Sequence, residues 1–527
     1  MKIVFSTLRF LLPLSEFSAN AFDVYMALPH HKPPAWLALR APLLIAATFV
    51  LLNLAGLDRS PVVWLDEVTL NDPAKELALH GKFRSSVFAG SSGFDATYLW
   101  QPPGQALVTA LAYKLFGFGI WQTRVPVVLF GAGAIIALYF FSMALFGSSR
   151  AAAIAAILFS LDPVFIQTAR SGRMDAQCLF LALSGCALLF RAEAHPASRC
   201  AWLACSGLLV GLAGITHPVA VAWAITAGVI LLFQSSGRLK GLASFGAFAA
   251  LPCMLWLTYA LHSPQLFRAQ FLSHGEEHIV SGPVWTKLAK ELTRCGASYK
   301  LVLLLLIAYV AGLIWVIGYS RYSRRTKLHL GILFTIPFLF NTLFMVKWEG
   351  FYQLHPISIL AVCAGAMVAA LVPRPSQMLR TRANLVVTLL VFSCFANTLM
   401  GGILARYIIL AYQWRARDYQ NVEKPIGQVI PKGSIVLGPP EAWYALERAG
   451  ASLRLTGKPD PRSHAFVITK AQGNVEDPRG FRHIQDIGYP LPPVLGRFNL
   501  PSADYRMRIW QAEEALSQLP DDGSSLQ

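Results

Sequence analysis

The stretch APLLIAATFVLLNLAGLDRSPVVWLDEVT (residues 41–69) contains the two features around which the rest of the chain is organised. Its first part, Ala41 to Leu57, is an apolar run close to the length of about 20 residues that an α-helix needs to cross a bilayer. Its second part places two adjacent carboxylates, Asp66 and Glu67, just after that run, where a membrane surface is expected. The stretch therefore predicts a membrane protein with acidic side chains at one surface.

The composition of the whole chain agrees with this expectation. Of its 527 residues, 55% are hydrophobic and 14% are charged, and the mean hydropathy is +0.49. Soluble domains usually have about 25% charged residues. Repeated apolar runs separated by short polar or basic loops predict many transmembrane helices, which excludes a single-span anchor.

The net charge of +17 could suggest a nucleic-acid partner, so its distribution matters. From Gln413 to the end there are 14 Lys and Arg residues and 13 Asp and Glu residues, so the charge of this part is nearly balanced. The excess of positive charge lies in the membrane half, where loops rich in Lys and Arg orient the helices because such loops stay in the cytoplasm. We therefore predict no nucleic-acid partner.

Eleven spans are expected, with twelve or thirteen allowed. By residue number they are 41–57, 122–146, 151–168, 176–191, 201–215, 218–233, 241–261, 301–320, 329–346, 356–372 and 385–412. The apolar run 104–117 is too short for a full crossing and is expected to be interfacial or re-entrant. The basic residues that fall on one side, predicted to be cytoplasmic, are Arg238, Lys240, Arg321, Arg324, Arg325, Lys327, Arg374, Arg380 and Arg382.

This alternation leaves the loop 58–103 and the tail on the extracytoplasmic side. Within the loop, Pro73 to His80 is expected to form a short amphipathic helix that ends at Gly81 and lies on the membrane interface. The tail, 413–527, loses the membrane composition: 434–437 and 465–468 predict strands, 442–449 predicts a helix, and 520–527 predicts a disordered end. The predicted fold class is thus an all-α polytopic membrane domain (1–412) followed by a small α/β domain.

Five polar clusters of the membrane half fall on the same extracytoplasmic side, which favours an enzyme. They are Asp66 with Glu67, Tyr98 to Gln101, Arg170 to Asp175, His217, and Lys347 to His355. Carboxylates at such a place suit general-base chemistry or a cation, and arginine suits phosphate because its planar fork donates in pairs. The alternatives are ordinary ones: loop acids, snorkelling arginines, a structural histidine and an aromatic interface belt.

The order of these motifs from Trp64 to Pro356 resembles the polyprenyl-phosphate-sugar glycosyltransferases of the GT-C fold, which include the lipid A aminoarabinose transferases and the protein O-mannosyltransferases. The matching segments are Asp66-Glu67, the helix ending at His80-Gly81, Tyr98 to Gly104, Leu115 to Gly117, Trp121 to Pro126, Ala169 to Asp175, and Lys347 to Pro356. Gln101 and Gly104 depart from the family, which has a basic residue or histidine and a leucine at these places. This departure argues against carrying over aminoarabinose specificity.

The resemblance implies a transferase that takes a sugar from a polyprenyl-phosphate donor and passes it, with inversion, to a glycolipid, glycan or protein acceptor on the outer face of the plasma membrane, the inner membrane of a bacterium. It implies that Asp66 is the general base, that Glu67 and Asp175 orient groups or bind a cation, and that Arg170, Arg173 and Lys347 stabilise the departing phosphate. The further substrate-binding residues that it implies are Tyr98, Gln101, His217, Tyr352 and His355.

Two other function classes stay open. A transporter or flippase should show paired interrupted helices and charges near the middle of the membrane, and a non-catalytic scaffold leaves the clusters on one face unexplained. No cofactor is expected with certainty, although a divalent cation beside the carboxylates stays open. The eight cysteines show no metal-ligand spacing, and Glu276-Glu277-His278 is interpreted as solvated loop charge.

Overall fold

The computed structural model describes residues 35–233, 237–278, 282–344, 350–372, 382–471, 477–490 and 504–513. Its α-helices are α3 Ala35–Leu54, α4 Leu65–His80, α5 Gly104–Phe116, α6 Ile120–Phe146, α7 Ser149–Ser160, α8 Pro163–Thr168, α9 Asp175–Ala194, α10 Arg199–Gly214, α11 Ala220–Leu232, α12 Arg238–Ala260, α13 Pro264–Phe267, α14 Ser273–His278, α15 Val284–Tyr299, α16 Leu303–Ile314, α17 Arg324–Phe344, α18 Leu354–Leu371, α19 Arg382–Thr398, α20 Ala405–Tyr412, α21 Gln420–Val429 and α22 Trp443–Arg448. Its strands are β1 Ile435–Leu437, β2 Ser452–Arg454, β3 Phe466–Lys470, β4 Phe481–Ile487 and β5 Met507–Ala512.

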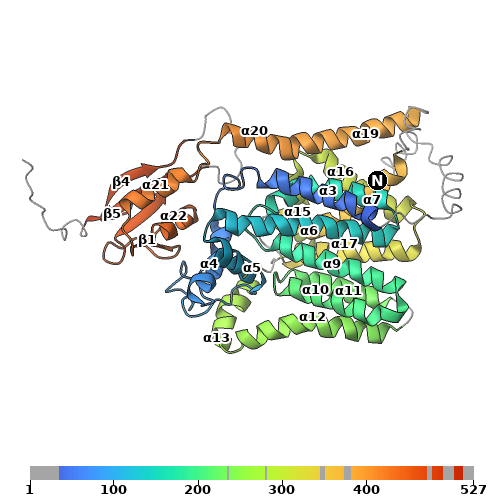
Figure 1. Ribbon diagram of the computed structural model, residues 1–527, viewed down its shortest axis with the longest axis horizontal. Helices are drawn as coiled ribbons and strands as arrows, with labels where there is room; N and C mark the ends of the chain where they lie inside the picture. The colour runs from blue at the N-terminus through green and yellow to red at the C-terminus, as the bar shows by residue number, and fades with distance from the viewer. Residues whose placement is uncertain are drawn as a thin grey trace, which may run out of the picture.

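Most of these helices form one bundle (Figure 1). Among the described residues, seven helical segments are long and apolar enough to cross a membrane, and four shorter ones are also apolar. The main apolar core lies between α3, α6, α7, α9 and α18. Small residues let helices approach closely, as at Gly365 of α18, which packs against Ala155 of α7. The predicted class, a polytopic helical membrane protein with a small C-terminal sheet, is confirmed.

The expected single span 151–168 is wrong in detail, because the chain breaks there into α7 and α8. Pro163 opens α8, and Asp162 caps it by accepting hydrogen bonds from the backbone N–H groups of Val164 and Phe165 at 2.9 and 3.0 Å. The second carboxylate oxygen of Asp162 accepts the hydroxyl of Tyr299 at 2.6 Å. The sequence Asp-Pro is therefore a helix start that the apolar residues around it conceal.

The helix expected from Pro73 to His80 begins eight residues earlier, at Leu65, so Asp66 and Glu67 lie in its first turn. Pro73 has no N–H to donate to the carbonyl of Thr69, four residues before it. The hydroxyl of Tyr98 donates to that carbonyl instead, at 3.4 Å. The helix ends as expected at Gly81, whose φ of 66° is left-handed. Its middle is buried, so it is not an amphipathic helix lying on a membrane interface.

The C-terminal sheet has five strands in the order β2-β1-β3-β5-β4. β1 pairs in parallel with β2 and β3, whereas β5 pairs antiparallel with β3 and β4. The strands and helix expected at 434–437, 465–468 and 442–449 are present as β1, β3 and α22. The end predicted to be disordered, 520–527, lies outside the described residues.

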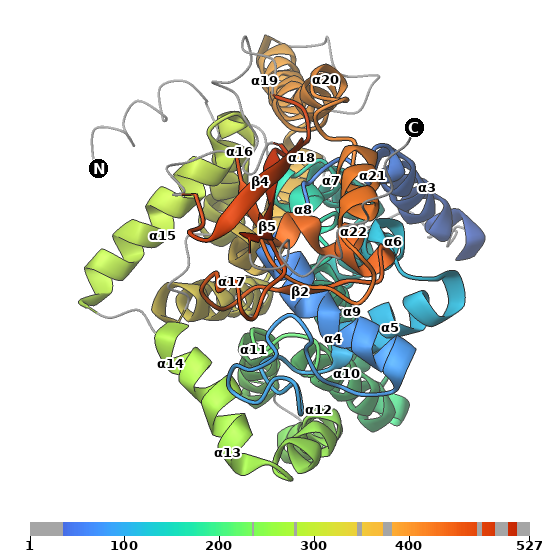
Figure 2. The same ribbon diagram turned by 90° about the vertical axis from the view of Figure 1, so that its left-hand side faces the viewer.

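The sheet, α21 and α22 lie at one end of the bundle, beside α4 and α5 (Figures 1 and 2). They share an apolar core with the segment 58–103, in which Val63, Val68 and Val87 pack with Trp443 and Tyr444. At the opposite end of the bundle, α12 and α19 begin at Arg238 and Arg382. The carboxylates of α4 and these basic helix starts are thus separated by the length of the bundle.

The structure explains why residue 104 is a glycine where the family pattern has a leucine. A Cβ at this position would lie 2.6 Å from the hydroxyl oxygen of Thr216 and 2.8 Å from the carbonyl oxygen of Ile215, which already accepts the N–H of Gly104 at 2.7 Å. We expect Gly104→Ala to lower the free energy of unfolding by about 1–3 kcal/mol through overpacking. Thermal unfolding in detergent measures this. Gly246→Ala, in α12 with no atom within 4 Å of the added Cβ, is the matched control and should leave stability unchanged or raise it by up to about 1 kcal/mol.

Candidate active site

The two adjacent carboxylates of α4 have different environments, although both lie in a first turn whose N–H groups favour negative charge. The Asp66 side chain is 18% exposed, whereas that of Glu67 is 0% exposed. A reactant can therefore reach Asp66 but not Glu67. This difference divides the pair into one group that can do chemistry and one group that holds structure.

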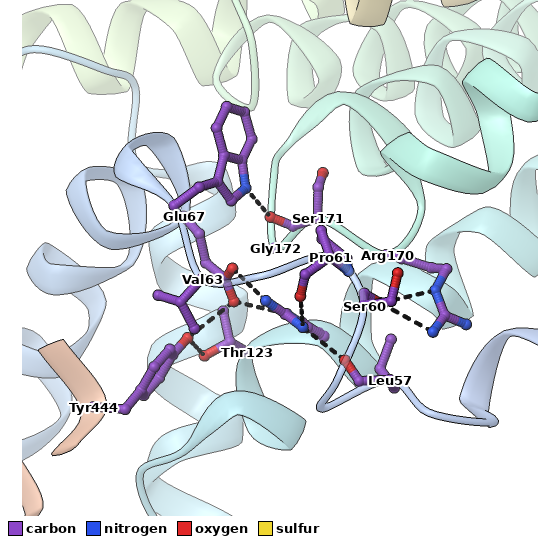
Figure 3. Close-up of polar contacts among 12 residues, drawn as sticks. Leu57, Ser60, Pro61, Val63, Glu67, Thr123, Arg170, Ser171, Gly172 and Tyr444 are labelled. Atoms are coloured by element: carbon purple, nitrogen blue, oxygen red, sulfur yellow. Dashed lines mark hydrogen bonds and ion pairs between the residues drawn. The ribbon is translucent and has the colours of Figure 1, made fainter. Parts of the chain in front are cut away.

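Glu67 is bound on both oxygens by Arg124 of α6. The Nε and Nη2 atoms of Arg124 donate to Oε1 and Oε2 at 2.8 and 2.6 Å, and its Nη1 donates to the carbonyls of Leu57 and Pro61. The Tyr444 hydroxyl donates to Glu67 Oε1 at 3.2 Å (Figure 3). Burial raises the pKa of Glu67, and Arg124 limits the rise. This bidentate pair fixes α4 against the bundle.

Asp66 is held by Arg173, whose Nη1 atom donates to Asp66 Oδ2. Arg173 also binds Asp175 through Nε at 2.8 Å, so one guanidinium bridges two carboxylates. Its Cζ lies 4.6, 5.7 and 5.9 Å from the ring centres of Phe351, Trp64 and Tyr352. Burial alone would lower the pKa of Arg173, but Asp175 and Asp66 outweigh it and raise that pKa well above its usual range. The predicted neighbours Asp66, Arg173, Asp175 and Tyr352 are therefore brought together.

Arg170, by contrast, is buried among backbone carbonyls. Its guanidinium donates to the carbonyl oxygens of Asn53, Ala55, Gly56 and Ser60. Figure 3 shows the contact with Ser60. Burial lowers its pKa well below the usual range, and Arg406 adds to the shift. These bonds tie the end of α3 to the turn after α8 and leave the guanidinium facing protein rather than a ligand. The geometry favours a structural role over the phosphate contact that the sequence suggested.

His217 and His355 approach the same cluster from the other side. His217 Nε2 lies 3.8 Å from Asp175 Oδ1, and the His217 ring stands edge-on to Tyr352 with ring centres 6.1 Å apart. His355, in the first turn of α18, accepts a hydrogen bond from Trp223 Nε1 at Nδ1, 2.9 Å away. Both expected histidines thus lie beside the Asp66–Arg173–Asp175 chain.

The remaining predicted residues have different outcomes. Tyr98 is buried and donates to the backbone of α4, which is a structural use of its hydroxyl. The side-chain oxygen of Gln101 is buried and has no hydrogen-bond partner in the described part of the chain. Lys347 lies outside the described residues. Within those residues, no group of three His, Cys, Asp or Glu side chains is placed to hold a metal ion.

The C-terminal domain contributes to the same region through α22. Glu447 receives the Lys75 ammonium at 2.7 Å, and Lys75 also contacts Asp72 and Glu76 at 3.2 and 3.3 Å. Tyr444, one helical turn before Glu447, bonds to Glu67 and to the Thr123 hydroxyl at 2.7 Å. Burial raises the pKa of Glu447, and Lys75 opposes that rise. One face of α22 therefore holds α4 at two points.

We expect Tyr444→Phe to lower the free energy of unfolding by about 1–3 kcal/mol, because it removes a hydroxyl from two buried partners, Glu67 and Thr123. Denaturant unfolding in detergent measures the change. Tyr489→Phe, at an exposed tyrosine of the same domain, is the control and should change stability by less than about 0.5 kcal/mol. Equal, small changes for both variants would remove Tyr444 from this role.

Parts of this chain are similar in sequence to known proteins. Residues 100–261 match the family model described as dolichyl-phosphate-mannose-protein mannosyltransferase. A putative mannosyltransferase of Bacillus subtilis, YkcB, is 24% identical over 173 residues, or 32% of this chain and 24% of that protein. The chain thus matches about a quarter of the length of that curated relative.

Solved structures resemble a larger part of the chain. ArnT from Cupriavidus metallidurans bound to undecaprenyl phosphate has a TM-score of 0.62 at 17% identity, covering 89% of this chain and 97% of that one. The arabinofuranosyltransferase AftD from Mycobacteria has a TM-score of 0.54 at 15% identity, covering 92% and 42%. The chain has the GT-C fold. The resemblance inferred from the motif order is thereby confirmed.

The matched family segment of this GT-C chain contains Gln101, Arg124, Arg173, Asp175 and His217, but neither Asp66 nor the tail. Sequence reasoning missed two contributors to the site. Arg124 had a usable signal, because an arginine within an apolar run is rarely without a function. Tyr444 had none, since 377 residues separate it from Glu67 and only the fold brings them together.

Proposed function

We propose that this chain is a membrane glycosyltransferase that moves a sugar from a polyprenyl-phosphate donor to an acceptor on the extracytoplasmic face. The observation that carries the proposal is the difference within the α4 pair: Asp66 is accessible and held by Arg173, while Glu67 is sealed against Arg124. The family match and the ArnT-like fold support the same reaction class. The sugar is taken as hexose or pentose.

In the proposed step, Asp66 accepts the proton of the acceptor nucleophile as that atom bonds to the anomeric carbon of the sugar. The bond between this carbon and the phosphate oxygen breaks, and the polyprenyl phosphate leaves with the electron pair. A single displacement of this kind inverts the configuration. Arg173 orients Asp66 and places positive charge next to the reacting atoms, where preorganised charge is worth about 3–4 kcal/mol in a water-poor site.

We further propose that α5 forms part of the groove for the polyprenyl chain. The helix has only 13 residues, which is short for a crossing, and it packs against α4 through Ala106, Ala110 and Tyr113. Its opposite stripe, Leu107, Leu111 and Leu115, is exposed at a spacing of four residues. An isoprenoid chain is an apolar partner suited to this stripe. Lys347, beyond the described part of the chain, is kept as a candidate contact for the phosphate.

The outward orientation rests on the position of the basic helix ends. The helices α12 and α19 begin at Arg238 and Arg382, at the end of the bundle away from α4, and basic loops favour the cytoplasm. The tail then covers the extracytoplasmic face of a plasma membrane, and we propose that it helps to hold the acceptor there. Protease accessibility of the tail in sealed vesicles of known orientation tests the sidedness.

A transfer assay tests the reaction class. Purified protein receives radiolabelled polyprenyl-phosphate hexoses and pentoses in turn, together with extracted glycolipids, cell-surface glycans or membrane proteins as acceptors. We expect label to move from at least one donor to one acceptor fraction. Binding of donor without transfer or hydrolysis would instead favour a lipid carrier.

A further inference from the structure

Three buried side chains beside the Arg173–Asp175 pair each hold one polar atom that has no hydrogen-bond partner among the residues that the structure describes. The atoms are His217 Nε2, His355 Nε2 and Gln177 Oε1, and the side chains belong to residues that are 4%, 1% and 5% exposed. Buried polar groups in folded proteins are nearly always hydrogen-bonded, so unpaired ones need an explanation. Their occurrence together around Asp175, which shares Arg173 with Asp66, points to a ligand.

The hydrogen bonds already made determine what each free atom can do. His217 Nδ1 accepts the backbone N–H of Val219 at 3.0 Å, and His355 Nδ1 accepts the indole N–H of Trp223 at 2.9 Å. A neutral imidazole whose Nδ1 accepts carries its proton on Nε2. Burial lowers the pKa of His217 to about 4, so this ring is neutral at neutral pH. Both histidines therefore present an N–H donor.

Gln177 presents the complementary group. Its amide nitrogen donates to the carbonyl of Gly104 and the hydroxyl oxygen of Thr216, both at 3.4 Å, and this leaves its carbonyl oxygen as a free acceptor. Thr216 is the residue before His217, and Gln177 lies two residues after Asp175 in the first turn of α9. His355 and His217 are near enough to interact electrostatically with each other and with Asp175. Asp175 and Thr216 therefore connect the three groups.

The mixture of donors and acceptor decides the class of ligand. An ammonium group can only donate, so it cannot satisfy two imidazole N–H groups, and a fully ionised phosphate can only accept, so it cannot satisfy Gln177. A hydroxyl group donates and accepts. The carboxylates nearby are also engaged: Asp66 and Asp175 by Arg173, and Glu67 by Arg124. Each of these three carboxylates therefore already has a cationic partner.

We infer that His217, His355 and Gln177 form a subsite for the hydroxyl groups of a neutral sugar ring on the lipid-linked donor. The inference rests on the proposed transferase function and narrows its donor to uncharged, polyhydroxylated sugars. It also gives a role to Gly104, whose missing side chain lets α5 approach Thr216 and so places the carbonyl that orients Gln177.

A substrate–mutant cycle tests the subsite. Full-length protein in detergent receives polyprenyl-phosphate mannose, its single deoxy analogues, and an amino analogue in which one hydroxyl is replaced by an ammonium group. The kcat/KM values are compared for the wild type and for His217→Leu, His355→Leu and Gln177→Leu. His217→Gln and His355→Gln keep an N–H group near the Nε2 position, and His262→Leu removes an exposed histidine as a control.

We expect each leucine variant to lose about 10- to 100-fold in kcat/KM with the full donor and to lose little more with one particular deoxy donor, because the contact is already gone. The glutamine variants should recover part of the loss, and the wild type should use the amino donor at least about tenfold less well.

If the loss caused by each mutation multiplies with the loss caused by every deoxy donor, these side chains contact only water or neighbouring protein, and the subsite is overturned. A preference of the wild type for the amino donor would also overturn it. Failure of the wild type to transfer sugar from any donor would overturn the proposed function itself, and the subsite with it. If a leucine variant does not fold, the glutamine variants and the comparison of donors in the wild type alone still test the subsite.

Discussion

Arg124→Leu is expected to lower the free energy of unfolding by about 3–5 kcal/mol, the largest effect on stability that we anticipate. The substitution leaves the Glu67 carboxylate buried without its guanidinium, and it also removes the donor to the carbonyls of Leu57 and Pro61. An uncompensated buried charge is far more costly than the ion pair is stabilising. Denaturant unfolding in detergent, followed by tryptophan fluorescence, measures the loss.

A double-mutant cycle separates the contribution of the ion pair to stability from that of the volume of the arginine side chain. Glu67→Gln combined with Arg124→Leu removes both charges, so the double variant should be more stable than Arg124→Leu alone. Arg325→Leu is the matched control, because that arginine is half-exposed in a surface pair with Glu193 and should change stability by no more than about 1 kcal/mol. An Arg124→Leu protein as stable as this control would refute the anchoring role of the pair.

Asp66→Asn is expected to reduce turnover by about 10²- to 10⁴-fold while the protein stays folded. Asparagine keeps the shape of the side chain and an oxygen that accepts from Arg173, but it cannot take the proton of the acceptor. Because the Asp66 side chain is partly exposed, removing its charge does not leave an unpaired charge buried in α4.

The measurement is label transfer from the best donor at saturating concentration, with thermal unfolding in parallel. Asp95→Asn changes an exposed carboxylate of the same segment, 58–103, and should retain wild-type turnover. Asp66→Glu displaces the carboxylate by one methylene and should fall between the two. A well-folded Asp66→Asn protein with full turnover would mean that another group is the base.

The parts of the fold that depend on local sequence could be predicted from it. Apolar runs of sufficient length identified most helices of the bundle, and Gly81 identified the end of α4. The start of α4 could not be found in this way, because Pro73 favours a helix start and the hydroxyl that replaces its hydrogen bond comes from Tyr98, 29 residues away. The break at Asp162 has a local signal in Asp162-Pro163, but the apolar residues around this pair concealed it.

The candidate site divides in the same way. Motif order identified Asp66, Arg173, Asp175, His217, Tyr352 and His355, and the fold brings these residues together. Sequence could not separate the roles of Asp66 and Glu67 or of Arg170 and Arg173, since each difference arises from burial and partners. Arg170 faces four backbone carbonyls and Arg173 faces two carboxylates, and neither fact is visible in the motif. The contribution of α22 depends wholly on tertiary structure.

The most direct test of the proposed reaction is the stoichiometry of lipid phosphate release. Donor with label in both the sugar and the polyprenyl phosphate is given to wild-type protein and to Asp66→Asn in vesicles containing acceptor. A transferase with Asp66 as its base releases one polyprenyl phosphate for each sugar transferred in the wild type, and almost none in the variant. Passage of intact donor across the bilayer without release of polyprenyl phosphate, in both proteins alike, would contradict it.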